Sequence, residues 1–264
     1  MVHQGDWRLN ALKPKTVAII PARLESSRLP RKALADICGL PMIVHVYQRC
    51  LLTQHLDAVY VATDSQEIRD IVESYGGRVL MTSSAHETGT DRIAEAAINI
   101  EAEIVVNVQG DEALVNPNYI DRVVEALYKD PTLQVAILVN PFSKRSSASD
   151  IKTVLNEYDD VLYFSRTDIP SDTRTLNPPL LKAYHIVPFR KDFLLQYSKW
   201  RKGVLESIEF NEYLRILEKG HRIHAVRVES DALSVDVQED LDYVRNIMLS
   251  DPFFSKYRRE TSVD

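Results

Sequence analysis

Short apolar runs alternate with longer segments of helical periodicity through the first half of the chain. The apolar runs are rich in β-branched residues and predict strands at 17–21, 58–62, 78–81, 104–108 and 135–138. Between them, apolar residues recur on one helix face and predict helices at 42–52, 66–75, 91–100 and 118–128. Strands that alternate with helices in this way favour right-handed crossovers and a mostly parallel sheet.

The pattern changes after about residue 140. A polar loop at 143–150 is followed by a strand at 161–166 and a proline-rich connection at 169–181. We expect next a strand at 183–189, a helix at 191–200, an amphipathic segment at 204–217, a strand at 223–228 and a helix at 238–249. The predicted organisation is an N-terminal extension (1–15), one α/β domain (16–249) with an excursion at 140–205, and a frayed tail (250–264).

The predicted fold is an α/β fold with three layers around an open sheet. The first three strands are apolar at almost every position, as in sheets that helices cover on both faces. In open parallel sheets a ligand binds beyond the carboxyl ends of the strands. The loops that follow the strands are therefore the places to look for function.

Composition and charge exclude several classes of protein. The chain has 264 residues, 38 acidic against 32 basic, for a net charge of −6, which does not fit a nucleic-acid-binding surface. No apolar run approaches the ~18 residues of a membrane span, and the N-terminus lacks a signal-peptide core. Two cysteines are too few for a disulfide framework. We expect a cytoplasmic protein with no membrane or nucleic-acid partner.

A concentrated patch of cations follows the first predicted strand. Arg23, Arg28, Arg31 and Lys32 lie within ten residues, with Glu25 as the one acid among them. Arginine and lysine in such a loop suit a triphosphate, although a solvated charged loop has the same composition. The glycine-rich motifs of dehydrogenases and P-loop NTPases are both missing. Any phosphates would therefore be held mainly by side chains.

Two further loops carry candidate chemistry. Gly89 would let backbone approach a ligand, and Thr90 would either cap the next helix or contact that ligand. Gln109, Asp111 and Glu112 follow the fourth strand, where a carboxylate suits Mg²⁺. Asp236 is a second possible ligand, or a helix cap in a box with Glu239. The same kind of box explains Asp64 with Glu67, and His45 in an apolar helix is expected to be packed.

Six blocks in order resemble one enzyme family. They are IIPARLESSRLPRKALADICGLPMIVHVYQR, VYVATDSQEI, LMTSSAHETGTDRIAEA, VVNVQGDEALV, VLYFSRTDIP and SVDVQEDLDYVR. Together they resemble 3-deoxy-manno-octulosonate (Kdo) cytidylyltransferases, also called CMP-Kdo synthetases, over residues 16–248. The resemblance implies a fold of the nucleotide-diphospho-sugar transferase type, with the excursion used for a homodimer.

The resemblance also implies roles for individual residues. Arg23, Arg28 and Lys32 would hold CTP; Gly89, Thr90, Arg92 and Gln109 would place the nucleotide; Asp111 and Asp236 would bind Mg²⁺. On the acceptor side, Arg166 would face the acceptor's carboxylate, with His185, Glu212 and Arg215 nearby. Of these, Lys32, Arg23, Asp111 and Asp236 would be catalytic.

The match is weaker around the acceptor. The family motif H-[IVL]-G-[IV]-Y is replaced by KAYHIVPFR, which places Ala183 at the family histidine and His185 at the family glycine. Tyr213 replaces glutamine in the block E-Q-L-R. Near the metal ligands, G-V-D-T becomes SVDV and D-E-P becomes D-E-A. The donor half is therefore better supported than the acceptor's identity.

The predicted reaction is transfer of CMP from CTP to a hydroxyl of Kdo, with release of pyrophosphate, for lipopolysaccharide or capsule precursors. A first alternative keeps this chemistry but uses another acidic acceptor, such as 8-amino-Kdo, a nonulosonate or a small phosphonate. A nucleotide-sugar glycosyltransferase is a second alternative, although G-D-E is not the usual D-x-D pair. The third is a non-catalytic nucleotide-binding module.

Overall fold

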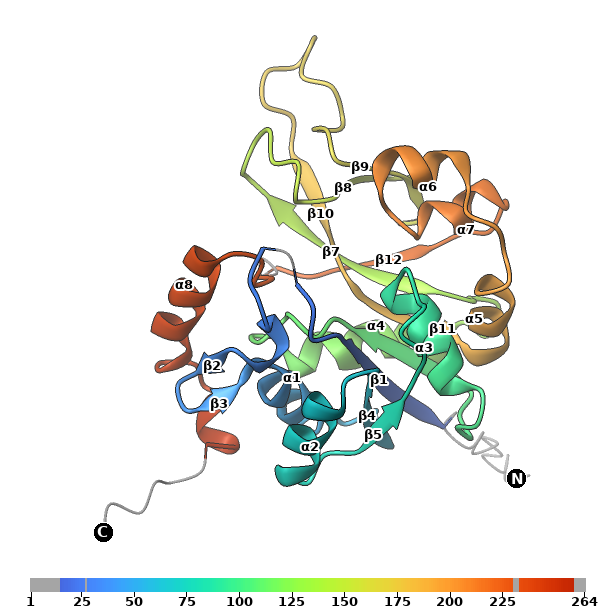
Figure 1. Cartoon of the computed structure of the whole chain (residues 1–264). Coiled ribbons are helices and arrows are strands. Elements are labelled where there is room, and N and C mark those ends of the chain that lie inside the picture. The colour runs from blue at the N-terminus through green and yellow to red at the C-terminus, as the bar shows by residue number, and fades with distance from the viewer. Residues whose placement is uncertain (1–14, 27, 230–232, 259–264) are drawn as a thin grey trace, which may run out of the picture.

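The chain folds around two five-stranded sheets (Figure 1). The computed structural model describes residues 15–26, 28–229 and 233–258. The first sheet has the order β11-β6-β1-β4-β5. Its strands are β1 (Thr16–Ala22), β4 (Ala58–Thr63), β5 (Val79–Met81), β6 (Ile104–Val108) and β11 (Ile186–Arg190). All neighbouring pairs are parallel except β11 with β6.

Helices cover both faces of this sheet. Alternate side chains of β1 enter two separate cores: Ala18 and Ile20 pack on one side, Val17 and Ile19 on the other. The first core includes α1 (Met42–Cys50), α2 (Gln66–Ser74) and α4 (Pro117–Lys129), and the second α3 (Gly89–Ala97) and α5 (Lys191–Tyr197). The three-layer α/β prediction is confirmed.

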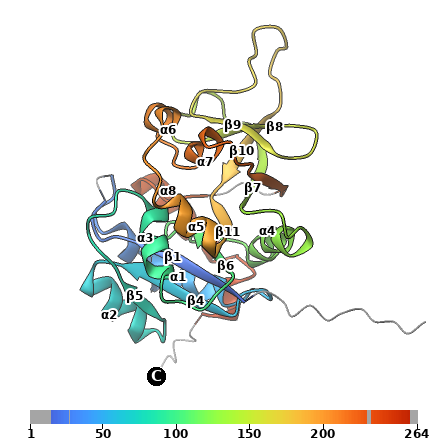
Figure 2. The ribbon, with the colours of Figure 1, turned by 90° about the vertical axis from the view of Figure 1, so that its right-hand side faces the viewer.

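The second sheet has the order β12-β7-β10-β8-β9 and is mostly antiparallel. Its strands are β7 (Ala136–Phe142), β8 (Lys152–Leu155), β9 (Val161–Ser165), β10 (Leu180–Tyr184) and β12 (His224–Arg227). It therefore draws on more of the chain than the predicted excursion at 140–205. Both ribbon views show it stacked above the first sheet, with the β9–β10 connection projecting beyond it (Figures 1 and 2).

One predicted strand passes between the two sheets. The apolar run at 183–189 was expected to form a single strand, but it divides at His185. On one side Tyr184 pairs with Leu138 of β7, and on the other Ile186 pairs with Val108 of β6. His185 thus lies at the junction of the sheets, beside the carboxyl end of β6.

The amphipathic segment at 204–217 also divides. It forms α6 (Val204–Glu209) and α7 (Leu214–Glu218), because Phe210 adopts a left-handed backbone conformation with φ +50°. The remaining elements are η1 (Lys32–Leu34), β2 (Asp36–Ile37), β3 (Leu40–Pro41), α8 (Gln238–Met248) and η2 (Phe254–Lys256). None of the helices in the described ranges has the length and hydrophobicity that crossing a bilayer requires.

The prediction of a frayed tail from residue 250 is wrong for residues 250–258. Phe254 is buried, and the Tyr257 hydroxyl lies 2.9 Å from Nδ1 of His45 in α1. Asp251 pairs with Arg49, whose side chain is fully buried, at 2.6 Å. His45 also donates from Nε2 to the Ile37 carbonyl at 2.7 Å, so it is packed as predicted. The C-terminal segment is part of the folded domain.

Candidate active site

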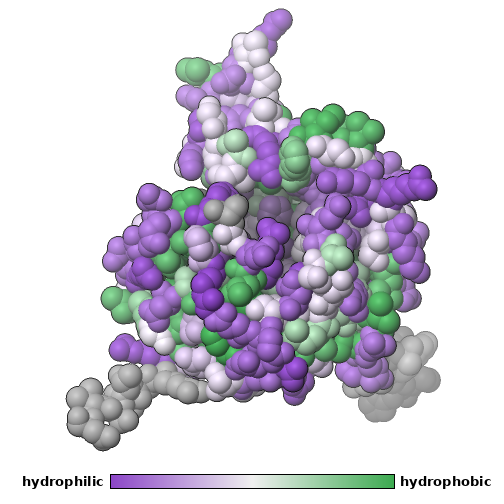
Figure 3. Space-filling model, viewed as in Figure 1, coloured by the Kyte–Doolittle hydropathy of each residue, from purple (hydrophilic) through white to green (hydrophobic). Residues whose placement is uncertain are grey.

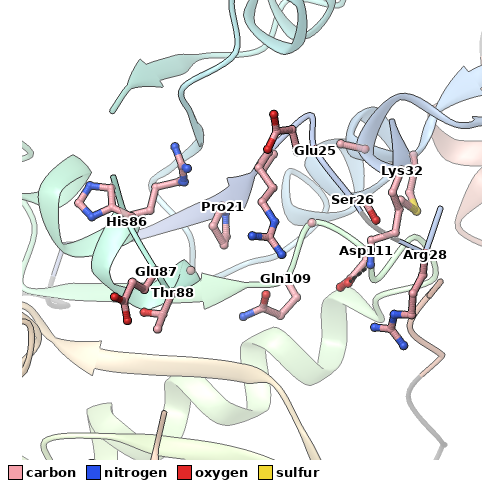
Figure 4. Close-up of a pocket in the computed structure, with 17 residues that line it drawn as sticks. Pro21, Glu25, Ser26, Arg28, Lys32, His86, Glu87, Thr88, Gln109 and Asp111 are labelled. Atoms are coloured by element: carbon pink, nitrogen blue, oxygen red, sulfur yellow. Dashed lines mark hydrogen bonds and ion pairs between the residues drawn. The ribbon is translucent and has the colours of Figure 1, made fainter. Parts of the chain in front are cut away.

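A pocket opens at the carboxyl ends of β1 and β6, beside the N-terminus of α3 (Figure 4). It encloses about 260 Å³. Much of the predicted nucleotide site lines it: Arg23, Arg28, Lys32, Gly89, Arg92, Gln109 and Asp111. His86, Glu87 and Thr88 form the opposite side, as Figure 4 shows. The sheet thus gathers loops that are distant in sequence around one cavity, as expected at the carboxyl edge of parallel strands.

Lys32 lies between the two predicted metal ligands. Its Nζ is 2.6 Å from Oδ2 of Asp111 and 3.1 Å from Oδ1 of Asp236, and Nη2 of Arg28 is 2.8 Å from the same Asp236 oxygen. Burial acts to lower the pKa of Lys32, but the two carboxylates outweigh it, and the pKa lies above its ordinary value. The ammonium therefore stays charged. It contacts Asp111, which lies 79 positions later in the sequence, and Asp236, which lies 204 positions later.

Glu112 links the loops that carry these two aspartates. The Ser234 hydroxyl donates to Glu112 Oε1 at 2.5 Å, and the Val235 amide donates to the Asp111 carbonyl at 3.1 Å. Burial, reinforced by the charge of Asp111, raises the pKa of Glu112 to about 7. The Asp236 segment is thereby fixed to the turn after β6.

The two aspartates have the donor chemistry that Mg²⁺ prefers. Among the described residues there is no group of three or more His, Cys, Asp or Glu side chains placed to hold a metal. Asp111 and Asp236 nevertheless turn one oxygen each toward the same cation, the Lys32 ammonium. Mg²⁺ typically takes one or two protein carboxylates and completes its shell with water and substrate phosphates. Two converging carboxylates beside this cation-lined pocket fit that pattern.

The α3 terminus differs from the sequence prediction in one detail. The cap is Thr88, whose hydroxyl accepts from the Asp91 amide at 3.1 Å, and not Thr90. Thr90 is buried and donates to Oε1 of Glu212 at 2.8 Å. Gly89 is needed for a close approach, because a Cβ there would lie 3.2 Å from the Pro21 ring.

Helix capping was also misassigned at the two aspartates considered for it. Ser65, not Asp64, caps α2, and Asp64 lies 3.3 Å from the Arg92 guanidinium instead. At α8 the residue that accepts from the Asp236 and Val237 amides is Asp240, not Glu239. The side chain of Asp236 is therefore left to face Lys32.

The predicted acceptor residues are dispersed. Arg166, at the end of β9, uses its guanidinium nitrogens on the carbonyl oxygens of Glu209, Ala148 and Phe210 at 2.7–3.1 Å. Arg215 forms a two-pronged pair with the buried Glu206, at 2.6 and 2.7 Å. Since that pair satisfies it away from the nucleotide pocket, Arg215 has a structural contact that the sequence did not indicate. Glu212 reaches the α3 terminus through Thr90, and His185 lies at the junction of the sheets.

The chain matches proteins of one family over most of its length. A family model described as "Cytidylyltransferase" matches residues 17–223. The chain belongs to the cytidylyltransferase family. It is 41% identical over 244 residues to the 3-deoxy-manno-octulosonate cytidylyltransferase of Geobacter metallireducens, covering 87% of this chain and 96% of that protein. The Escherichia coli protein of the same name is 39% identical, covering 89% and 96%.

A solved structure agrees with this family. It is the structure of CMP:2-keto-3-deoxy-manno-octonic acid synthetase complexed with CTP. It superposes with a TM-score of 0.86 at 38% identity, covering 89% of this chain and 99% of that one. The fold and the class of enzyme, a CTP-dependent nucleotidyltransferase, are therefore as the sequence predicted.

Sequence reasoning on this cytidylyltransferase missed Lys182. It lies in β10, its side chain is 12% exposed, and its Nζ is 2.7 Å from Oδ1 of Asp150. Its charge acts on both Glu112 and His185. The available signal was a lysine in an otherwise apolar strand pattern, which favours a partnered interior charge over a surface one.

Proposed function

We propose that this cytidylyltransferase transfers CMP from CTP to a hydroxyl of 3-deoxy-manno-octulosonate. The observation that carries the proposal is the cluster of Lys32, Arg28 and Asp111, which line a cation-rich pocket, with Asp236, which pairs with both cations. Pairs of carboxylates beside arginine and lysine suit a metal-bound triphosphate. The acceptor is the one that the names of the relatives above give, and a cytoplasmic location is part of the proposal.

The chemistry is a displacement at phosphorus. The acceptor hydroxyl oxygen attacks the α-phosphorus, the bond to the bridging oxygen of the β-phosphate breaks, and pyrophosphate leaves with the hydroxyl proton passing to solvent. Arg23, Arg28 and Lys32 neutralise and orient the phosphates, and positioning of this kind supplies most of the catalysis in phosphoryl transfer. Asp111 and Asp236 would hold Mg²⁺, which when bound neutralises phosphate charge and activates the hydroxyl.

On the acceptor side, the sugar acid would lie against the second sheet. Arg166 and Lys182 are cations of this sheet, and the charge of each acts on His185. Cations of this kind match the carboxylate of a 2-keto sugar acid. We assign no general base.

The test is a pyrophosphate-release assay. CTP and UTP are each offered with Mg²⁺ and Kdo, with 8-amino-Kdo, a nonulosonate and a phosphonate as competing acceptors. We expect pyrophosphate release from CTP with Kdo. In Asp111→Asn the rate of release should fall by at least about 100-fold, because the variant lacks one of the two carboxylates that would hold Mg²⁺ beside the triphosphate. Asp70→Asn on the exposed face of α2 is the matched control. Release with another acid but none with Kdo would overturn the acceptor.

We also propose a homodimer through the second sheet. Leu162 in β9, and Val204, Ile208 and Phe210 in and after α6, are each 59–73% exposed. Figure 3 shows hydrophobic residues gathered over α6. An apolar patch of this kind on a soluble protein marks an interface, and a second copy is the occupant that the family resemblance implies.

Light scattering tests the homodimer. The parent protein should have twice the mass of the chain, and the double variant Phe210→Ser with Ile208→Ser should have the mass of one chain. A parent protein with the mass of one chain would contradict the proposal.

A further inference from the structure

The segment that carries Asp236 is attached to the turn after β6 at three successive residues. The Ser234 hydroxyl donates to Oε1 of Glu112 at 2.5 Å, and the Val235 amide donates to the Asp111 carbonyl at 3.1 Å. The carboxylate of Asp236 then faces the same ammonium as that of Asp111. Ser234 is thus two residues from one predicted metal ligand and hydrogen-bonded to the neighbour of the other.

The turn after β6 is a firm anchor for this segment. The Glu112 amide donates to the Gln109 carbonyl at 3.2 Å, and the Glu112 carbonyl accepts from the Val115 amide at 2.9 Å. Gly110 packs so closely on the end of β1 that a Cβ there would lie 2.8 Å from the Pro21 carbonyl oxygen. Because Glu112 is 3% exposed, its carboxylate has little water to take the place of the serine hydroxyl.

The serine hydroxyl supplies the second of two attachments on this side of the segment. The first is the single backbone bond of Val235, and a chain held at one such bond is free to pivot about it. On the opposite side, Asp240 accepts from the amides of Asp236 and Val237 at 2.9 and 3.1 Å. With Ser234 bonded as well, the backbone that carries the Asp236 carboxylate is fixed from both sides.

Two departures of this chain from the family motifs meet at this attachment. Ser234 stands at the glycine of G-V-D-T, and Ala113 stands at the proline of D-E-P. Ala113 is buried in the same apolar cluster as Val235. A proline at 113 would restrict its own backbone and that of Glu112 before it. This chain lacks that restriction, and the serine hydroxyl restrains Glu112 through its side chain.

Building on the proposed function, we propose that Ser234 is a positioning residue for the metal site. Its hydrogen bond to Glu112 keeps the carboxylate of Asp236 turned toward that of Asp111, so that both can bind one Mg²⁺. The hydroxyl takes over the restraint that a proline at position 113 would supply. Ser234 does not line the nucleotide pocket, so its effect on the reaction passes through the affinity for the metal.

A metal-binding measurement tests this without turnover. Mn²⁺ is titrated into the protein with CTP and without any acceptor, and the relaxation rate of water protons reports Mn²⁺ that is held on the protein. A titration of CTP alone gives the baseline. Ser234→Ala removes the hydroxyl and keeps Cβ, while Ser234→Thr keeps both. Ser250→Ala, at an exposed serine beyond α8 whose hydroxyl bonds only the Ile247 carbonyl, is the matched control.

The expected result is a loss of metal affinity that the hydroxyl alone explains. Ser234→Ala should weaken Mn²⁺ binding by about 10-fold, while Ser234→Thr and the control stay within about three-fold of the parent. In steady-state assays the Mg²⁺ concentration for half-maximal rate should rise in Ser234→Ala, and saturating Mg²⁺ should restore kcat. An unchanged Mn²⁺ affinity in Ser234→Ala would overturn the inference, whatever that variant does to stability in urea.

A proline at position 113 tests the exchange of restraints. Within the described ranges the Ala113 amide makes no hydrogen bond, so Ala113→Pro removes none. Added to Ser234→Ala, it should bring the Mn²⁺ affinity back to within about three-fold of the parent. A double variant that binds Mn²⁺ as weakly as Ser234→Ala would show that the hydroxyl does not stand in for the proline.

The outcomes separate this inference from the proposed reaction. Weaker Mn²⁺ binding by Ser234→Ala supports the inference even if the parent releases no pyrophosphate with Kdo, and then only the reaction fails. Pyrophosphate release by the parent, together with parent-like Mn²⁺ binding by Ser234→Ala, overturns the inference and leaves the reaction standing. A parent protein that does not bind Mn²⁺ beside CTP overturns both the metal site and the role of Ser234.

Discussion

Lys32 shows how much of this site depends on single side chains. The Lys32 ammonium contacts both Asp111 and Asp236, and both contacts are made by the side chain. The contact joins the first loop of the sheet to the segment before the last helix. It also keeps two carboxylates from facing each other without a counter-charge.

We expect Lys32→Met to lose activity while the fold is kept. The variant retains most of the side-chain volume but leaves Asp111 and Asp236 in mutual repulsion and removes a phosphate-binding charge. Pyrophosphate release should fall by about 100-fold or more. Lys129→Met, at an exposed lysine of α4 paired with Glu125, is the control. Activity within about two-fold of the parent would contradict a role for Lys32 at the phosphates.

His45 makes stability depend on pH. Burial lowers its pKa to about 4, below the 6.5 of an unfolded histidine. The unfolded chain therefore binds a proton more readily, and the stability due to neutral His45 is complete above pH 6.5 and lost as pH falls toward 4. The full difference is on the order of 3 kcal/mol. His185 contributes with the same sign, and Glu112, whose pKa is raised to about 7, with the opposite sign between pH 4.5 and 7.

Urea unfolding at pH 7.5, 6.0 and 5.0 would measure this dependence. Subtracting the His45→Gln curve from the parent curve cancels the other groups and leaves the contribution of His45. We expect the difference to shrink as pH falls. A difference that does not vary with pH would show that His45 titrates normally.

At the residue scale, chemistry was easier to predict than capping. Many of the charged residues that line the pocket could be named because they follow predicted strands, and a parallel sheet brings such loops to one edge. Caps could not, because Thr88 and Thr90 differ by two positions and either can accept an amide hydrogen bond. Which one does so depends on where α3 begins, and tertiary contacts such as that of Thr90 with Glu212 fix that point.

At the scale of elements, the packing of the C-terminal segment against α1 could not be predicted from the sequence. Its apolar and aromatic residues follow a helix end and a proline, a pattern that is typical of a loose end. Its partners, Arg49 and His45, lie about 200 residues earlier in α1. No local pattern reports a contact at that distance.

We expect Asp251→Ala to destabilise the whole domain. Arg49 has a fully buried side chain, and Asp251 is its carboxylate partner at 2.6 Å. Removing one member of a buried pair leaves an uncompensated charge, which costs about 3 kcal/mol. Urea denaturation would measure it, with Asp242→Ala, at an exposed aspartate of α8, as the control. A loss similar to that of the control would mean that water or another group solvates Arg49.

Strands that are buried and mostly apolar were predicted from the sequence. The point at which one apolar run divides into two strands was not, because it depends on the strands with which the run pairs. β1, β4 and β6 are apolar at most positions, so their existence followed from the pattern of residues. The run at 183–189 divides because its first half pairs with β7 and its second half pairs with β6. Both halves are apolar, so nothing in the pattern marks His185 as the point of transfer.

For the molecule as a whole, the net charge of −6 hides a local concentration of cations. Arg23, Arg28, Lys32 and Arg92 line one pocket, while many acids lie on outward helix faces. Steering of CTP should therefore depend on this pocket and be screened by salt. The order of the six sequence blocks along the chain predicted the overall fold. It does not predict the oligomeric state, because a dimer depends on how exposed side chains of separate elements combine.

We expect KM for CTP to rise by roughly 3- to 10-fold between 50 and 500 mM salt, with little change in kcat. The measurement compares sodium chloride with potassium acetate, so that an effect of one particular ion is recognised. Arg23→Gln should reduce the dependence, because it removes one of the screened charges. A KM that does not vary with salt would indicate that the phosphates are held by contacts already shielded from solvent.

The attachment of Tyr257 and Asp251 to α1 has a consequence for synthesis on the ribosome. His45 and Arg49 are made about 200 residues before their partners Tyr257 and Asp251. Until that segment has been made, the growing chain carries the Arg49 guanidinium without its carboxylate, so the core around α1 cannot reach full stability. The segment at 251–257 therefore decides when α1 is fully packed.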